Sequence, residues 1–360
     1  MSKLKSPEVN ISFIEKGESA IQRGERGIVA LALSEKTKME AFTAYSVTDI
    51  PSGLSAQNAQ YVKDALQGYE VAPKKVLVYV MQGTPEKLNA EYTAMLKYFA
   101  QTKFDYLTIP TVKTDGKTNE VVTWIKSLRT EQKLKRKVVL PEVAGDNEGI
   151  INVSASLTRP DGTVLTPEQV TPRIAGLICG TPLSISITYA PLKDFIDCQR
   201  FTKQEADEAV GAGKLIFMYD GEKVKVNRGV NSLSTTTEVK GDSFKKIKIV
   251  EIMDMIYEDI RRAWEDTYVG RYANTYDNKC LLITAINSYF AGLVRSNLLS
   301  KGECYIDIDG QREYLKQKGV DVNNLSEQAV KEENTGSRVF LRANISILDA
   351  MEDMDLEIYL

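Results

Sequence analysis

Residues 76–81 read VLVYVM, an unbroken apolar run that predicts a β-strand buried on both faces. The next residues, Thr84-Pro85-Glu86, predict the start of a helix with Thr84 as its N-cap and Pro85 in the first turn. The apolar stripe of this helix recurs at helical spacing and comprises Leu88, Tyr92, Met95, Leu96 and Phe99. The stretch therefore predicts a buried strand followed by an amphipathic helix.

The same alternation continues to residue 141. Residues 106–109 read YLTI and end at Pro110, and residues 138–140 read VVL and end at Pro141. Between these two predicted strands, apolar residues at 121, 122, 124, 125 and 128 predict a second helix. Strands that alternate with helices of this length predict a parallel sheet in an α/β layer fold.

Residues 150–235 predict shorter elements. Asp161-Gly162 is a turn signal between two β-prone runs, 152–157 and 163–165, and predicts a small hairpin. Residues 173–180 read RIAGLICG and predict a helix of small residues that packs closely against a neighbour. A short helix at 203–210, a strand at 215–219 and a second hairpin turn at Asp220-Gly221 complete this region.

After Gly241 the pattern becomes mainly helical. Residues 244–269 form one long helical pattern, with apolar side chains at Ile249, Ile252, Met253, Ile256, Ile260 and Trp264. Residues 278–299 predict a second helix, 304–309 a strand and 313–318 a short helix. We therefore expect an α+β block separate from the first domain.

The two ends of the chain alternate like strands, and neither has an obvious partner strand in its own neighbourhood. The apolar positions are Val9, Ile11 and Phe13 at the start, and Val339, Leu341, Ala343, Ile345, Ile347, Leu356, Ile358 and Leu360 at the finish. A terminal amphipathic strand carries unpaired N–H and C=O groups and seeks a sheet edge. If that edge belongs to another copy, the two arms build a polymer. Residues 16–27 and 334–337 are expected to be flexible connections to the arms.

Composition narrows the function classes. The 360 residues carry a net charge of −3, which gives no electrostatic footprint for nucleic acid, and no apolar run approaches the ~20 residues that span a bilayer. The first residues, MSKLKSPEVN, are not followed by the apolar region of a secretory signal, so we expect synthesis in a cytoplasm. The cysteines, at 179, 198, 280 and 304, are scattered and are expected to be free thiols and not zinc ligands.

Candidate catalytic chemistry is sparse. The chain contains no histidine, which removes serine–histidine and cysteine–histidine catalysis but leaves carboxylate or lysine chemistry open. Gly211-Ala-Gly213-Lys214 lacks the earlier glycine and the following Ser or Thr of a phosphate loop, so a turn is expected there. No catalytic residue, cofactor site or metal site is predicted. A divergent hydrolase-like α/β enzyme is the alternative to a structural protein.

Two charged segments each allow two interpretations. The acidic residues Glu352, Asp353, Asp355 and Glu357 lack the spacing of a calcium loop and predict either a solvated turn or a contact with a neighbouring subunit. The helical stretch 244–269 mixes cations with carboxylates and predicts either an exposed face with salt bridges or charge pairing between subunits. Its cations are Lys245, Lys246, Lys248, Arg261 and Arg262.

Several segments, taken in order, resemble the contractile tail sheath proteins of bacteriophages and phage-tail-like bacteriocins. They are RIAGLICGTP (173–182) followed by 184–189, NRGVNSL (227–233), FKKIKIVEIMDMIYEDI (244–260), YDNKCLL (276–282) and NTGSRVFLRANISILDAM (334–351). The likeness spans nearly the whole chain. It is greatest to the short sheaths of Gram-positive prophages and diffocin-like R-type bacteriocins.

The resemblance implies a subtilisin-like α/β core domain without protease activity, plus an α+β C-terminal domain and extended strand arms. The expected boundaries are an N-terminal arm at 1–26, the core at 27–240, the assembly domain at 241–337 and a C-terminal arm at 338–360. Sheaths of this family form stacked hexameric rings around an inner tube and contract to drive the tube through a target cell envelope. Arms from two neighbouring copies complete the C-terminal sheet of a third.

The resemblance also implies a set of partners. These are further copies of the chain, the inner tail tube protein, and the baseplate and tail terminator proteins, without nucleic acid and without membrane insertion. Assembly is expected in the cytoplasm of a bacterial host, as part of a phage tail or a phage-tail-like particle.

Overall fold

The structure is a computed structural model that describes residues 21–359. The described chain divides into two compact units. The sheet unit comprises residues 23–258, 296–298 and 347–359, and the helical unit comprises residues 21–22, 259–295 and 299–346. The division falls within helix α6 (Ile247–Ala263), between Glu258 and Asp259, whereas the sequence placed a boundary at 240/241.

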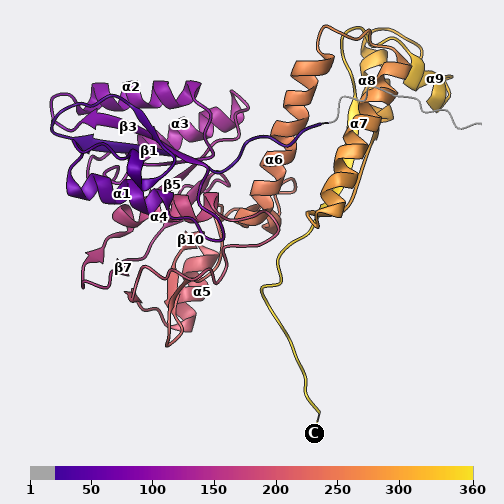
Figure 1. Cartoon of the computed structure of the whole chain (residues 1–360). Helices are drawn as coiled ribbons and strands as arrows, with labels where there is room; N and C mark the ends of the chain where they lie inside the picture. The colour runs from indigo at the N-terminus through magenta and orange to yellow at the C-terminus, as the bar shows by residue number, and fades with distance from the viewer. Residues whose placement is uncertain (1–20, 360) are drawn as a thin grey trace, which may run out of the picture. The chain divides into compact units, whose positions relative to one another are not determined.

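A seven-stranded sheet forms the centre of the sheet unit (Figure 1). Its order is β10-β6-β5-β4-β1-β3-β2, and neighbouring strands are parallel except for β2, which runs antiparallel to β3. The strands are β1 (Ile28–Glu35), β2 (Phe42–Ala44), β3 (Lys75–Gln82), β4 (Tyr106–Thr108), β5 (Lys137–Pro141), β6 (Ile150–Val153) and β10 (Lys214–Leu215). The parallel α/β sheet predicted from residues 75–141 is confirmed; the subtilisin-like detail stays a prediction.

Successive side chains of each strand point to opposite faces of the sheet, and an apolar core covers each face. In β1, Val29 belongs to one apolar core and Ala30 to the other. The first core contains residues of α1 (Ala56–Leu66) and α4 (Pro167–Cys179), and the second contains residues of α2 (Leu88–Gln101) and α3 (Thr118–Thr130). The sheet unit therefore has three layers, with helices on both faces of the sheet.

Helices α1 and α4 pack closely because Gly176 has no side chain. A Cβ atom on Gly176 would lie 2.4 Å from the carbonyl oxygen of Ala65, far closer than van der Waals contact allows. The sequence prediction of a closely packed helix of small residues is thus confirmed. The helix begins at Pro167, after a capping box between Thr166 and Gln169.

Shorter elements complete the sheet unit. They are η1 (Val47–Asp49), β7 (Leu157–Thr158), β8 (Val164–Leu165), β9 (Asp197–Cys198), α5 (Lys203–Gly211), β11 (Phe217–Tyr219), β12 (Val224–Val226) and η2 (Asp242–Lys245). The two predicted hairpins, at Asp161-Gly162 and Asp220-Gly221, are antiparallel as expected. However, residues 152–157 are not one hairpin strand, because β6 ends at Val153 within the main sheet and the chain then turns into β7.

The helical unit starts in the last turn of α6. The helix continues as a π-helical stretch, η3 (Trp264–Tyr268), and is followed by α7 (Tyr276–Arg295), β13 (Leu299–Ile306), α8 (Ile308–Gln317), α9 (Glu327–Glu332) and β14 (Leu341–Ile347). The predicted long helices are confirmed with shifted ends. Within residues 21–359, no helix is long and apolar enough to cross a membrane.

Two features of the sheet unit differ from the sequence prediction. Helix α2 begins at Leu88 and not near Thr84, because the N–H groups of Lys87 and Leu88 both donate to the Thr84 carbonyl oxygen at 3.0 Å and close a turn first. The sequence pattern predicts no strand at residues 28–35, yet β1 occupies them and lies between β4 and β3 in the sheet.

The described part of the predicted N-terminal connection is held by ion pairs. Glu25 Oε1 lies 2.8 Å from Lys74 Nζ, and the Arg26 guanidinium contacts the Glu251 carboxylate. The backbone N–H of Lys74 also donates to the Gly27 carbonyl oxygen at 2.8 Å. The expectation of a flexible connection is therefore wrong for residues 25–27, because they are bonded to the sheet unit.

Candidate assembly interface

The predicted arm residues fall into three groups. Outside the described residues lie Val9, Ile11, Phe13 and Leu360. In or just before β14 lie Val339, Leu341, Ala343, Ile345 and Ile347, and in the extended segment after β14 lie Leu356 and Ile358.

The strand β14 has a partner within its own chain, β13. The Asp307 N–H, after the end of β13, donates to the Phe340 carbonyl oxygen at 3.0 Å, before the start of β14. Ser300 Oγ, near the start of β13, donates to the Ser346 carbonyl oxygen at 3.4 Å, so the two strands run antiparallel. The prediction that residues 341–347 have no local partner is therefore wrong, because β13 begins at Leu299 and not at the predicted residue 304.

One edge of this two-stranded sheet lies along β14. The carbonyl groups of Phe340 and Ser346 and the N–H of Leu348 point toward the β13 side. Since alternate residues of a strand direct their backbone groups to opposite sides, Ala343 and Ile345 direct theirs to the outer side. Among residues 21–359, β13 and β14 pair only with each other. The outer edge of β14 therefore offers a row of N–H and C=O groups to another strand.

The segment before β14 is fixed by one side chain. Asn274 Nδ2 donates to Thr335 Oγ1 (3.0 Å) and to the carbonyl oxygens of Gly336 (2.8 Å) and Arg338 (2.9 Å). The expectation of a flexible connection at 334–337 is wrong for the bonded residues 335 and 336. The next residue after this segment, Val339, lines a cavity of about 440 Å³ together with side chains that include Trp264, Tyr268 and Leu282.

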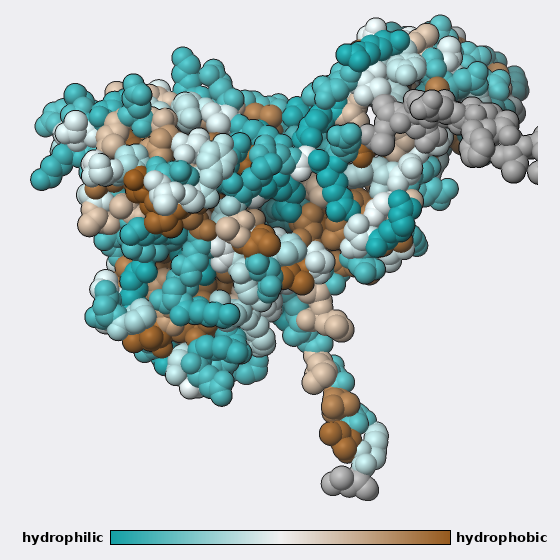
Figure 2. Space-filling model, in the orientation of Figure 1, coloured by the Kyte–Doolittle hydropathy of each residue, from teal (hydrophilic) through white to brown (hydrophobic). Residues whose placement is uncertain are grey.

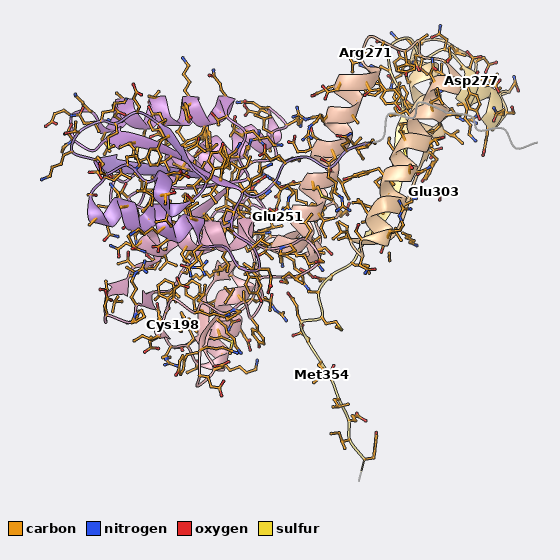
Figure 3. All side chains as sticks on the ribbon, viewed as in Figure 1. Cys198, Glu251, Arg271, Asp277, Glu303 and Met354 are labelled. Atoms are coloured by element: carbon orange, nitrogen blue, oxygen red, sulfur yellow. The ribbon has the colours of Figure 1, made fainter. Side chains whose placement is uncertain are left out.

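The C-terminal tail, residues 349–359, belongs to no helix or strand. Its last residues are apolar and exposed: Leu356 is 68% and Ile358 75% accessible to solvent. Figure 2 shows hydrophobic colour along this narrow segment, and in Figure 3 the labelled Met354 lies on it. An exposed apolar segment of this kind is a candidate for contact with another molecule.

The first part of the tail is bound to the sheet unit through charges. Arg228 Nη2 lies 2.5 and 2.6 Å from the two carboxylate oxygens of Asp353, and Lys246 Nζ lies 3.2 Å from Glu352 Oε2. Lys246 also pairs with Asp349. The prediction of a solvated acidic turn is thus wrong for Glu352, whose side chain is only 5% exposed, because cations more than 100 residues earlier in the chain cover it.

These contacts change the proton affinity of the groups involved. The Asp353 carboxylate raises the pKa of Arg228, and Arg228 in turn lowers the pKa of Asp353. Burial alone would lower the pKa of Lys246, but the carboxylates of Asp349 and Glu352 outweigh it and raise that pKa. All of these shifts favour the charged forms, so the ion pairs persist across neutral pH.

A second charge cluster binds the first half of α6 to the sheet. Lys137 Nζ of β5 lies 2.9 Å from Glu251 Oε1 and 3.2 Å from Asp254 Oδ2, both on α6, where Figure 3 labels Glu251. Arg129 of α3 holds both carboxylate oxygens of Asp254, at 2.9 and 3.1 Å. The Tyr106 hydroxyl donates to Glu251 Oε1 at 2.8 Å. The prediction of an exposed salt-bridged face is wrong for Glu251 and Asp254, because β4, β5 and α3 bury them.

Burial and pairing act in opposite directions within this cluster. Burial would raise the pKa of Asp254, but the charges of Lys137 and Arg129 outweigh it and lower that pKa. Burial lowers the pKa of Lys137, against the opposing effect of Asp254. A buried ion pair of this kind is costly to break by removing one partner, since the remaining charge stays in the interior.

Two of the cysteine thiols are poorly suited to nucleophilic chemistry. Burial raises the pKa of Cys198 and of Cys304 to about 11, so both stay protonated and poorly nucleophilic near neutral pH. Residues 21–359 contain no group of three or more Cys, Asp or Glu side chains placed to hold a metal ion. Gly213 adopts a left-handed φ of 71° in the turn between α5 and β10, which agrees with the predicted turn at this position.

Comparison with known proteins identifies the family. Residues 86–232 match the model of the phage tail sheath protein central domain, and residues 239–360 match that of the phage tail sheath C-terminal domain. The tail sheath protein of the Clostridium phage phiCD119 is 38% identical over 358 residues, which cover 97% of this chain and 98% of that protein. This chain belongs to the phage tail sheath family. The resemblance inferred from the ordered segments is confirmed.

Solved structures of sheath proteins share the fold of this sheath-family chain. The sheath tail protein of Desulfitobacterium hafniense is 20% identical with a TM-score of 0.69, over 83% of this chain and 94% of that one. The helical sheath of the anti-feeding prophage in its contracted state is 13% identical with a TM-score of 0.68, over 99% of each chain. The α/β fold class predicted from the sequence is therefore confirmed across nearly the full length.

Membership of the tail sheath family bears on the role of this interface. It favours a structural role and does not favour the alternative of a hydrolase-like enzyme. The residues that hold the tail, Arg228, Lys246 and Glu352, were not singled out as a site by the sequence analysis. Each lies in a segment that the sequence analysis named, Arg228 in NRGVNSL, Lys246 among the cations of 244–269 and Glu352 in the acidic run, but spacing alone gives no sign that they meet.

Proposed function

We propose that this chain is the repeating structural subunit of a contractile tail sheath and polymerises as stacked hexameric rings around an inner tube. One observation carries the proposal: an open strand edge and an exposed apolar segment occur in the same chain. The outer edge of β14 is open among the described residues, and the apolar end of the tail is exposed. A segment and an edge that each lack a partner in one copy can satisfy each other between copies.

The energetics favour a continuous lattice. Each backbone hydrogen bond in such a joint contributes only about 0.5–1.5 kcal/mol. Several bonds for each arm, repeated on every subunit, bind a copy to more than one neighbour, so a single subunit cannot leave alone. The N-terminal segment with Val9, Ile11 and Phe13 supplies the second arm in this proposal.

The wider setting follows from the same function. The lattice surrounds the inner tail tube protein, joins a baseplate at one end and a tail terminator at the other, and forms in the cytoplasm of the bacterial host. Contraction is a switch between two packings of the subunits that drives the tube through the target cell envelope. The name of the phiCD119 relative, tail sheath protein, supports this setting.

The test is assembly of truncated chains. The full-length chain should form striated tubes in negative-stain electron microscopy. Deletion of Met354–Leu360, or of Met1–Glu15, should leave a folded chain with an unchanged circular dichroism spectrum that forms no tubes. A Lys113→Gln chain, altered at an exposed pair with Glu142, should assemble normally and serves as the control. Normal tubes from either truncation contradict the arm mechanism, and discrete particles from the full-length chain contradict the function itself.

A further inference from the structure

The side chains of the tail make different contacts before and after residue 354. Before it, Asp349, Glu352 and Asp353 are bound to the sheet unit through their carboxylates. After it, the side chains of Met354 (84% exposed), Leu356 and Ile358 are solvent-accessible. Because residues 349–359 belong to no helix or strand, side-chain contacts decide which part of the tail is held.

The central contact is a polar site built around the Glu352 carboxylate. Glu352 Oε1 lies 2.6 Å from Thr188 Oγ1 and 3.1 Å from Ser186 Oγ, two hydroxyl groups that can donate to it. Lys246 Nζ lies 3.2 Å from the other oxygen. The carboxylate thus has hydrogen-bond donors and a cation around it, which offsets the cost of its burial.

The backbone of the sheet unit fixes this site. The Gly229 N–H donates to Thr188 Oγ1 at 3.0 Å and so orients the hydroxyl that faces Glu352. A Cβ atom on Gly229 would lie 2.9 Å from Ile187 Cγ1, so a larger residue at this position would displace the Ile187 side chain. The neighbouring Arg228 is thereby placed against Asp353.

We propose that these contacts form a tail anchor, with Thr188, Arg228 and Lys246 on the sheet unit and Asp349, Glu352 and Asp353 on the tail. The tail anchor is a positioning device that fixes the residue at which the C-terminal arm becomes free. Only the segment from Met354 onward is then exchanged with a neighbouring copy. This inference rests on the proposed function, because it assigns the arm its length within the same joint.

The tail anchor limits the reach of the arm. Extended chain spans at most roughly 3.3–3.6 Å for each residue, so residues 354–359 reach roughly 20 Å from the anchor. Without the anchor, the free segment would begin after Leu348, whose N–H donates to the Leu298 carbonyl oxygen at 3.0 Å. Residues 349–359 would then reach nearly twice as far, roughly 38 Å. The shorter arm selects one neighbouring edge, whereas the longer arm could reach several.

The tail anchor can be tested on the unassembled full-length chain with a protease that cleaves after glutamate. The bond after Glu357 lies in the exposed segment and should be cut first, whereas the bond after Glu352 should be protected. In Arg228→Gln with Lys246→Gln, the ratio of cleavage at Glu352 to cleavage at Glu357 should rise about tenfold or more, because the site then opens locally. Mass spectrometry of the released C-terminal peptides measures this ratio.

Matched variants distinguish the anchor from a general loss of charge. Arg200→Gln with Lys113→Gln also removes one arginine and one lysine from the sheet unit, at exposed pairs with Asp197 and Glu142, and should leave the ratio unchanged. Exchange of the charges, Arg228→Asp with Asp353→Arg, should restore part of the protection that Arg228→Asp alone removes from the bond after Glu352. Equal cleavage at Glu352 and Glu357 in the unaltered chain would overturn the tail anchor.

Assembly provides an independent second measurement. The Arg228→Gln, Lys246→Gln chain should form tubes that are fewer or irregular, and the matched Arg200→Gln, Lys113→Gln chain should form normal ones. Regular tubes from a chain whose Glu352 bond has lost protection would show that the anchor does not position the arm. Failure of the unaltered chain to form tubes contradicts the proposed function alone, because the cleavage ratio is measured without assembly.

Discussion

Lys137 Nζ lies 2.9 Å from Glu251 Oε1, and both side chains are less than 10% exposed. The pair joins β5 to α6, two elements that lie far apart in the sequence. Its charges are separated from water, so the pair responds to substitution very differently from an exposed ion pair.

Lys137→Met should lower the free energy of unfolding by about 3 kcal/mol, because it leaves two carboxylates, Glu251 and Asp254, short of one cation in the interior. Lys137→Met with Glu251→Met should cost less than the sum of the two single substitutions. Urea unfolding of the unassembled chain measures these values. Lys203→Met, at an exposed pair, should change stability by less than about 0.5 kcal/mol. Additive costs for Lys137 and Glu251 would contradict the pairing.

The hydrogen bonds of Asp146 should make the stability of the fold depend on pH. Its carboxylate accepts the N–H groups of Thr235 at 2.9 Å and Ser234 at 2.8 Å, which lowers its pKa from 3.8 to about 2. Because the folded-state pKa is below the unfolded value, this contribution to stability is complete above about pH 5 and is lost as the pH falls from about 4 to 2.

The measurement compares the unaltered chain with Asp146→Asn in urea at a series of pH values. The asparagine keeps an acceptor oxygen but has no charge to lose. The stability difference between the two chains should be constant above pH 5 and should shrink toward pH 2. A difference that does not change between pH 5 and 2.5 would show that the charge of Asp146 contributes nothing.

Proline substitutions on β14 separate its two edges. Ala343→Pro removes an N–H that points to the outer side, so the isolated chain should keep its stability within about 1 kcal/mol and lose tube formation. Asn344→Pro removes an N–H on the β13 side and should destabilise the fold itself. Thermal unfolding and negative-stain microscopy of both variants check this contrast. Normal tubes from Ala343→Pro would exclude the outer edge of β14 as the site of strand addition.

The apolar face of the free arm should be needed only for assembly. Leu356→Asp with Ile358→Asp should leave the melting temperature unchanged, since both side chains are already exposed in the isolated chain. The same variant should form no tubes, because two charged groups would have to enter an apolar contact. Glu357→Gln, on the opposite side of the same segment, is the control and should assemble. Tubes from the double variant would show that this face is not buried in the lattice.

The parts of the fold that were predicted correctly depend on local patterns. Residues 76–81 and 138–140 are apolar without interruption, and this signals a strand covered on both faces wherever it occurs. β1 carries the same signal in Ile28–Leu33 and could have been found by it. The signal says that a strand is buried, but it does not say which strands lie next to each other.

The charge contacts could not be predicted in the same way. Glu251 and Asp254 lie three residues apart on α6, which is equally compatible with a solvated face and a buried one. The difference is made by Lys137 and Arg129, which the fold brings to them from distant positions. Similarly, Glu352 and Asp353 look like ordinary surface charges until Arg228 is placed beside them.

The sequence analysis missed the pairing of β14 with β13 for another reason. The sequence predicted a strand at 304–309, too late and too short to reach the full length of Leu341–Ile347, because Ser300 and Lys301 hide the start of β13 among polar residues. The two strands also lie on either side of α8 and α9, so no short turn marks them as neighbours.

A tail fixed at Asp353 sets the register of the arm, because the alternation of side chains beyond Asp353 begins at a defined residue. One residue inserted between Asp353 and Met354 would turn Leu356 and Ile358 to the opposite face of the strand, whereas two inserted residues would return them to the original face. Insertions in this segment should therefore follow an odd–even rule for assembly. Length variation among working arms would be confined to even steps, a constraint on sequence drift that no single side chain in the tail imposes.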